Sequence, residues 1–187
     1  MLKHKNILRS IGVLALLLVQ LGLLFQVIFS YESLRRSGYV YKFHLQPADP
    51  YDAFRGRYLY LNFMDLELPE STDKKVSKVY DILIKADEWG FAEALDAYAL
   101  DDEKPSNSYL QGYISYNNRL SIPFSRFYLQ EEYAKLLDKH INEIIKDNLV
   151  YATLAIKDGK GRILDVYVND TPIVEYLKQN YLKEQYN

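Results

Sequence analysis

Residues 150–170 read VYATLAIKDGKGRILDVYVND, and this segment carries the strongest hairpin signal in the chain. Two runs of alternating apolar residues flank a DGKG turn, which is the pattern of a β-hairpin. Side chains alternate between the two faces of a strand, so the apolar positions of both runs should share one buried face. We expect that face to contain Val150, Ala152, Leu154, Ile156, Leu164, Val166 and Val168.

Helices are predicted on both sides of this hairpin. Residues 130–147 place apolar side chains on one stripe, which predicts an amphipathic helix that packs on the sheet. His140 lies on that stripe, where we expect it at the margin of the core rather than as a ligand. Thr171 as N-cap and Pro172 at the first helical position predict a final helix that ends near Leu182. The stripe consists of Tyr133, Leu136, Leu137, Ile141, Ile144 and Ile145.

Two strands are predicted nearer the N-terminus of the domain. In residues 39–45, aromatic or leucine residues alternate with Val40, Lys42 and His44. The segment QPADPYDAFRG at 46–56 contains two prolines and a glycine and predicts a turn. Alternation then resumes, with Leu59, Leu61 and Phe63 opposed to Tyr58, Tyr60 and Asn62.

The middle of the chain predicts further short strands. Residues 65–75 are charged and predict a loop, whereas 79–84 resemble a strand that ends at a DEWG turn. Residues 91–100, FAEALDAYAL, have helical composition but follow Gly90, and we predict a strand that pairs back. Two more strands are expected at 109–116 and 119–124. The expected fold class is α+β with a mainly antiparallel sheet.

An apolar segment precedes the domain. Ile11–Phe29 contains no charge and would rise about 28 Å as a helix, enough to cross the hydrocarbon core of a bilayer. A cleavable signal peptide is the alternative, but the exit FSYESLRRS does not offer the expected small residues. The predicted organisation is therefore a cytoplasmic N-terminus (1–10), a transmembrane helix (11–29), a juxtamembrane linker (30–38) and an outer domain (39–187).

Charges beside this span predict its orientation. Basic residues are slightly more frequent before the span than after it, so the positive-inside rule places the N-terminus in the cytoplasm. We therefore expect a single-pass membrane protein whose residues 11–29 contact the lipid bilayer and whose domain is extracytoplasmic. The residues concerned are Lys3, Lys5 and Arg9 before the span, and Glu32, Arg35 and Arg36 after it.

Composition excludes several classes of function. The net charge of −2, with acids and bases interspersed, offers no basic patch for nucleic acid. Cysteine is absent, and His4, His44 and His140 have no metal-site spacing, so we expect no metal site and no cofactor. No serine stands in a G-x-S-x-G elbow, and no catalytic residue is assigned. The 18 tyrosines suit half-buried strands.

The segment 49–63, DPYDAFRGRYLYLNF, carries a family resemblance. Its Gly56, Tyr58, Leu61 and Phe63 resemble the motif of the GDYXXLXY family of small membrane-anchored bacterial proteins. Arg57 stands where the motif has Asp, and Phe63 where it has Tyr. The order of an anchor, a DPYD turn, an RFYLQEE segment and a DGKG hairpin is also similar, so the resemblance covers most of residues 39–175.

The resemblance implies a location rather than a reaction. The family is functionally uncharacterised, and similar domains occur beside or joined to multi-pass membrane proteins, which implies an accessory module with such a protein as partner. The motif alternates as a strand should, and Gly56 permits a bulge or a tight entry to that strand. We therefore interpret the motif first as a signature of the fold.

Two hypotheses of function follow from the 49–63 segment. The first is a binding module for another membrane or envelope component, because aromatic residues and arginine are enriched at binding hot spots. The alternative is an envelope hydrolase or lyase that uses Asp49 and Asp52, whose pKa values the nearby arginines would lower. A structural role, with the acids capping the turn, is also open. The proposed contact residues are Tyr51, Phe54, Arg55 and Arg57.

Overall fold

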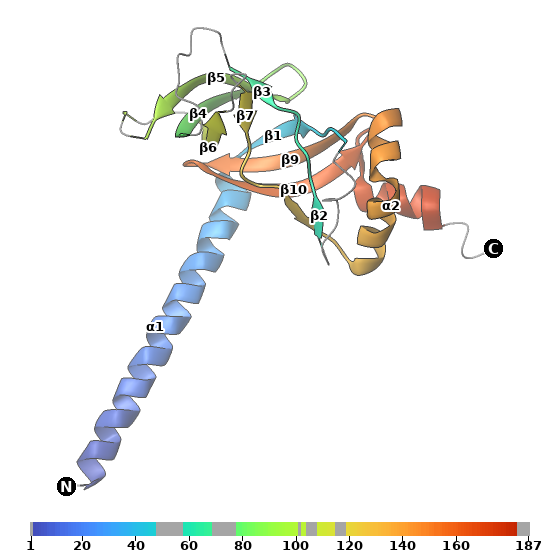
Figure 1. The fold of residues 1–187 in the computed structure, drawn as a ribbon. Helices are drawn as coiled ribbons and strands as arrows, with labels where there is room; N and C mark the ends of the chain where they lie inside the picture. The colour runs from blue at the N-terminus through green and yellow to red at the C-terminus, as the bar shows by residue number, and fades with distance from the viewer. Residues whose placement is uncertain are drawn as a thin grey trace. The chain divides into compact units, whose positions relative to one another are not determined.

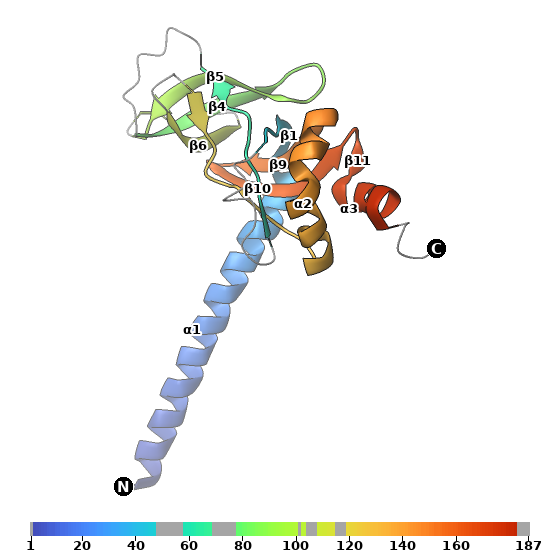
Figure 2. The same ribbon diagram turned by 45° about the vertical axis from the view of Figure 1, so that its right-hand side comes forward.

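The structure is a computed structural model, and its chain divides into two compact units, Met1–Ser37 and Gly38–Asn187. Each unit is described by itself, and Figures 1 and 2 show the elements of both. The described residues are 2–47, 58–68, 78–100, 102–103, 108–114 and 119–182.

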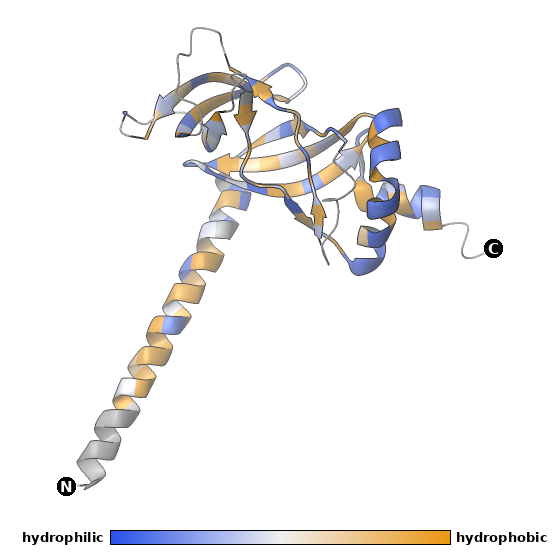
Figure 3. Cartoon of the chain, in the orientation of Figure 1, coloured by the Kyte–Doolittle hydropathy of each residue, from blue (hydrophilic) through white to orange (hydrophobic). Residues whose placement is uncertain are grey.

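The first unit is one helix, α1, from Leu2 to Ser37. Its part Ile11–Arg36 is long and apolar enough to cross a membrane, and Figure 3 shows the apolar residues along it. The helix continues through most of the predicted linker, where Glu32 accepts hydrogen bonds from Arg35 and Arg36. Such pairs one turn apart support a helix. The assignment of residues 1–10 to the cytoplasm and 11–29 to the bilayer stays a prediction.

The predicted hairpin lies within a four-stranded antiparallel sheet. Its turn residues Asp158 and Gly159 have φ values of 51° and 76°. Two positive φ values define the two-residue turn that best matches the twist of a hairpin, so the DG dipeptide has the conformation that its sequence favours. The sheet has the order β1-β9-β10-β11 and consists of β1 (Tyr39–His44), β9 (Val150–Lys157), β10 (Lys160–Val168) and β11 (Thr171–Pro172).

A β-bulge at Leu164 changes one predicted core position. Ile163 pairs with Leu154 and Asp165 with Thr153, so the register shifts between Ile163 and Asp165. Ile163 packs against the core cluster, to which Leu164 does not belong. The prediction for Leu164 was wrong because one extra residue reverses the alternation of faces along the strand. The other six predicted inner residues are buried.

A second sheet has five antiparallel strands. The ambiguous segment 91–100 forms strand β5, as predicted, because it pairs back on β4 after the turn at Gly90, whose φ is 86°. The predicted loop at 65–75 contains the short strand β3, which lies against β5, so the sheet curls strongly. The order is β3-β7-β6-β4-β5, with β3 (Leu66–Glu67), β7 (Arg119–Ser121), β6 (Tyr109–Ile114), β4 (Val79–Ala86) and β5 (Ala92–Ala99).

The remaining elements are a two-stranded sheet and the helices. Strand β2 (Tyr58–Tyr60) pairs with β8 (Arg126–Tyr128), and β8 leads into helix α2 (Glu131–Asp147). Helix α2 confirms the predicted amphipathic helix, since its apolar stripe lies in the core or packs against it. A short helix α3 (Ile173–Leu177) and a π-helix (Lys178–Leu182) follow β11.

The start of the final helix differs from its prediction. Thr171 pairs with Val168 in the two-residue strand β11, and Pro172 is the N-cap of α3. Asn169 and Asp170 both have positive φ, 48° and 66°. These two residues therefore make a second tight turn, which places Thr171 in a strand and prevents it from capping the helix.

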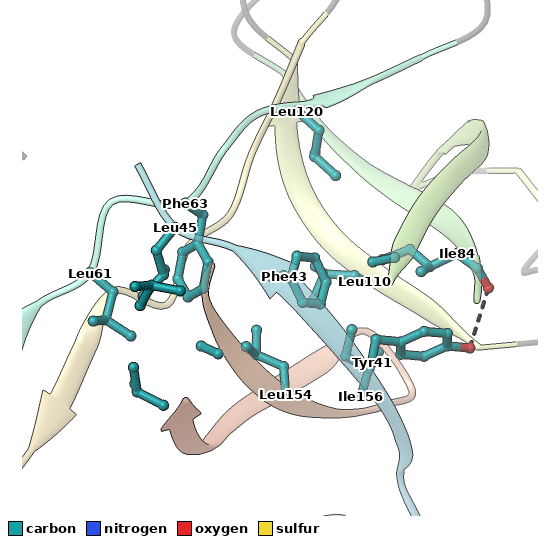
Figure 4. Close-up of a cluster of buried hydrophobic side chains, with 14 of the residues drawn as sticks. Tyr41, Phe43, Leu45, Leu61, Phe63, Ile84, Leu110, Leu120, Leu154 and Ile156 are labelled. Carbon is teal, nitrogen blue, oxygen red and sulfur yellow. Dashed lines mark hydrogen bonds between the residues drawn. The ribbon is translucent and has the colours of Figure 1, made fainter. Parts of the chain in front are cut away.

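One core joins the sheets and the helices (Figure 4). The tip of the β9–β10 hairpin docks on β6, because the Gly159 N–H donates to the Tyr109 carbonyl and the Gly159 carbonyl accepts from the Gln111 N–H. A Cβ at Gly159 would lie 3.0 Å from side-chain atoms of both Tyr109 and Gln111. The second sheet therefore holds the hairpin tip at close range.

Substitution of Gly159 tests this docking. We expect Gly159→Ala to lower the free energy of unfolding by about 2–4 kcal/mol, because strain at positive φ adds to the clash with β6. Gly90→Ala is the matched control, since Gly90 has similar φ but only the tip of Lys42 nearby, at 3.9 Å. The control should cost about 1–2 kcal/mol. Equal losses in thermal unfolding, followed by circular dichroism, would show that the tip is not tightly docked.

Candidate functional site: the outer face of the motif strand

Strand β2 and the residues after it carry the family motif, and one side of this segment lies in the core. Leu61 and Phe63 are 3% and 8% exposed, and the Phe63 ring packs edge-on against Phe43 at 6.0 Å. Figure 4 shows both motif residues beside Leu45 in the buried cluster. The Met64 N–H donates to the His44 carbonyl, which joins the segment to β1. Leu61 and Phe63 therefore support the interpretation of the motif as a fold signature.

The opposite side of β2 faces outward together with β8. Tyr58 lies opposite Tyr128 and Tyr60 opposite Arg126, and these four residues are called the motif face. The rings of Tyr58 and Tyr128 are 5.7 Å apart, and the guanidinium of Arg126 lies 5.3 Å from the Tyr58 ring. Tyr60 is 44% exposed and Tyr128 67% exposed. The motif face thus presents tyrosine and arginine, residue types enriched at binding hot spots.

An open depression adjoins the motif face where β8 passes into α2. It has a volume of about 610 Å³ and is lined by Tyr128, Leu129, Gln130 and Glu131. Gln130 is the N-cap residue of α2, but its side chain does not cap the helix. Its amide can therefore both donate and accept hydrogen bonds toward a ligand.

Sequence reasoning found only half of this face. Tyr58 and Tyr60 were predicted on the side opposite to Leu59 and Leu61, and they lie there. Arg126 and Tyr128 were noted only within the RFYLQEE segment that leads into the helix. The available sequence signal was the alternation of polar and apolar character in β8. This strand has only three residues, which is too few to establish a period.

The predicted contact residues Tyr51, Phe54, Arg55 and Arg57 lie outside the described residues, as do Gly56 and the alternative catalytic pair Asp49 and Asp52. The binding and hydrolase or lyase hypotheses for these side chains stay predictions.

Hydrogen bonds tie the chain before this segment to the motif strand after it. The Gln46 N–H donates to the Asn62 carbonyl at 2.9 Å, and the Asn62 side-chain amide donates to the Pro47 carbonyl at 2.9 Å. The Gln46 side chain also donates to the Phe63 carbonyl. Pro47 is therefore fixed beside the motif strand.

A second cluster of rings lies on the face of the four-stranded sheet opposite to the core. His44 stacks on Phe91 at 3.9 Å, and Tyr151 stacks on Tyr167 at 5.2 Å. Tyr151 is only 4% exposed, and its hydroxyl donates to Asp170. Burial, and secondarily this hydrogen bond, raise the pKa of Tyr151. The rings pack on one another, so we assign this cluster to stability rather than to binding.

His44 and His140 offer no metal-binding arrangement. His140 packs its ring 4.6 Å from Tyr181, and its side chain is 21% exposed, which confirms the expected place at the margin of the core. Within the described ranges, no group of three His, Cys, Asp or Glu side chains could hold a metal ion.

Fold and site together define an antiparallel α+β domain that follows an apolar N-terminal helix and carries a two-faced motif strand. A family model described as GDYXXLXY protein matches residues 20–166. The chain belongs to the GDYXXLXY family. No curated protein and no solved structure gives a significant match.

The two faces of the motif strand should respond differently to truncation. We expect Leu61→Ala to lower the free energy of unfolding by about 2–5 kcal/mol, because it leaves a cavity in the core. Tyr60→Ala, at the preceding residue, should change the free energy of unfolding by less than about 0.5 kcal/mol, because that ring lies on the exposed face of the strand. Chemical denaturation of both variants measures the difference. A large loss for Tyr60→Ala would contradict the assignment of the outer face.

His44 should make stability depend on pH. Burial lowers the pKa of His44, although Asp87 partly opposes this shift. The unfolded chain, with a pKa of about 6.5, then binds a proton more readily than the folded chain, so stability falls as the pH drops below about 6.5.

His44→Phe keeps a ring on Phe91 but cannot titrate. Its melting temperature should fall less than that of the wild type between about pH 7 and pH 5. If the melting temperatures of the two proteins fell equally with pH, His44 would not contribute to the pH dependence of stability.

Proposed function

We propose that this protein is a membrane-anchored binding module whose domain docks through the motif face onto an integral membrane protein. The observation that carries the proposal is that the exposed Tyr60, Arg126 and Tyr128 and the half-buried Tyr58 face outward on the β2–β8 strand pair, whose other side is core. Large exposed rings gain free energy when a partner covers them, and tyrosine does so with few lost degrees of freedom because its side chain has two χ angles.

The motif face is held in one arrangement before any partner binds. The Leu61 N–H donates to the Ser125 carbonyl at 2.6 Å, which extends the contact between the two strands. The Tyr58 ring interacts with both the Arg126 guanidinium and the Tyr128 ring. A surface ordered in advance loses less conformational entropy on association, so more of the contact energy appears as affinity.

The proposal also includes the attachment of the protein to a membrane and its orientation there. Helix α1 supplies the anchor through residues 11–29, and the charge difference across it favours a cytoplasmic N-terminus and an extracytoplasmic domain. A multi-pass membrane protein is the proposed partner, and attachment to the same bilayer raises the effective concentration of the domain beside it. Tyr51, Phe54, Arg55 and Arg57, which directly precede the motif strand in sequence, are proposed to extend the same interface.

Co-purification from native membranes tests the proposal. Full-length protein in mild detergent should bring down one integral membrane protein in near-stoichiometric amount, identified by mass spectrometry. With the double variant Tyr58→Ala, Tyr128→Ala, the amount of partner recovered should fall by at least about tenfold. This is the loss expected when hot-spot rings are removed.

Tyr113→Ala is the matched control, because Tyr113 lies on strand β6 of the five-stranded sheet and is 49% exposed. It should retain the partner at the wild-type level. Equal recovery with the double variant would remove the motif face as the interface. Loss of its thermal transition would show instead that the two rings hold the fold.

A further inference from the structure

Two open depressions adjoin each other along the first turns of α2. The first, beside the motif face, reaches from Tyr128 to Glu131. The second has a volume of about 390 Å³ and is also lined by Glu131, so the two adjoin at that residue. The two adjoining depressions together are called the α2 groove. Its lining residues are Tyr128, Leu129, Gln130, Glu131, Glu132, Lys135, Leu136 and Leu182.

The groove is apolar at both ends and acidic in the middle. Tyr128 and Leu129 line one end, and Leu136 and Leu182 line the other. Between them, Glu131 is paired with Lys135 at 2.8 Å. Glu132 has no ion pair or hydrogen bond from its side chain to another described residue. The middle of the groove therefore carries one negative charge that a ligand can neutralise.

The charge of Glu132 also has a structural use, because a carboxylate in the first turn of a helix is favoured by the helix dipole. That role does not require apolar side chains on both sides of the carboxylate. The same negative charge disfavours phosphates and other anions in the groove. The lining is therefore complementary to a ligand with a cation between two apolar groups.

We propose that the α2 groove binds an extended peptide segment of the partner with the pattern apolar–x–basic–x–apolar. In an extended chain, every second side chain points the same way, about 6.6 Å apart. Three such side chains would meet Tyr128 and Leu129, then Glu132, then Leu136 and Leu182. The inference rests on the proposed function, because it takes the partner to be a protein that binds beside the motif face.

Selection from a random heptapeptide display library tests the inference. The bait is the full-length protein in lipid nanodiscs, and three versions are compared: wild type, Glu132→Lys and Glu143→Lys. Wild type should enrich peptides with a lysine or arginine between two apolar residues by at least about tenfold over empty nanodiscs. Glu132→Lys should reverse the preference to Asp or Glu at the same position.

Glu143→Lys is the matched control, since it makes the same charge change on the same helix, about 16 Å further along its axis. It should keep the wild-type preference. A thermal transition in each bait shows that α2 is intact.

Three results would overturn the inference: no enriched peptide, a purely apolar pattern, or a basic preference that survives Glu132→Lys. The proposed function would still stand if the motif-face variant loses its membrane partner in the co-purification. Reversal by Glu132→Lys would support the groove even if that co-purification returned no partner.

Discussion

Pairing of β9 on both of its edges is the constraint on which the rest of the domain depends. The strand pairs with β1 on one side and with β10 on the other, and from Val150 to Ile156 only Thr153 is not fully buried. An extended backbone can be buried only when its N–H and carbonyl groups are bonded, and the two neighbours satisfy them. The inner side chains of β9 can then meet α2, α3 and the second sheet in one core.

The motif strand is positioned through this central strand. The Leu45 N–H donates to the Val150 carbonyl of β9, and Leu45 also forms a bridge with Phe63 of the motif. The core is thus continuous from β9 through β1 to β2. The departure of this chain from the family motif at Phe63 fits such a position, because a ring packed on Phe43 needs no hydroxyl. The outer face of the β2–β8 strand pair can present tyrosines because its inner face is anchored in this way.

The motif face and the α2 groove share Tyr128, so the proposed interface combines a sheet surface with the start of a helix. Strand β8 makes this possible, since it pairs with the motif strand and then runs directly into α2. Residues far apart in sequence therefore contribute to one surface.

Sequence alone determined the elements whose periodicity is long enough to report burial: the alternation of β1, that of residues 58–63, the β9–β10 hairpin, and the amphipathic stripe of α2. It also determined the apolar N-terminal helix and the family. Only the tertiary structure decided the bulge at Leu164, the short strands β3 and β11, and the pairing of Tyr58 with Tyr128. Strands of two or three residues show no period, and a bulge shifts it by one residue. The face of the candidate site depends on pairing between distant segments, which local patterns do not encode.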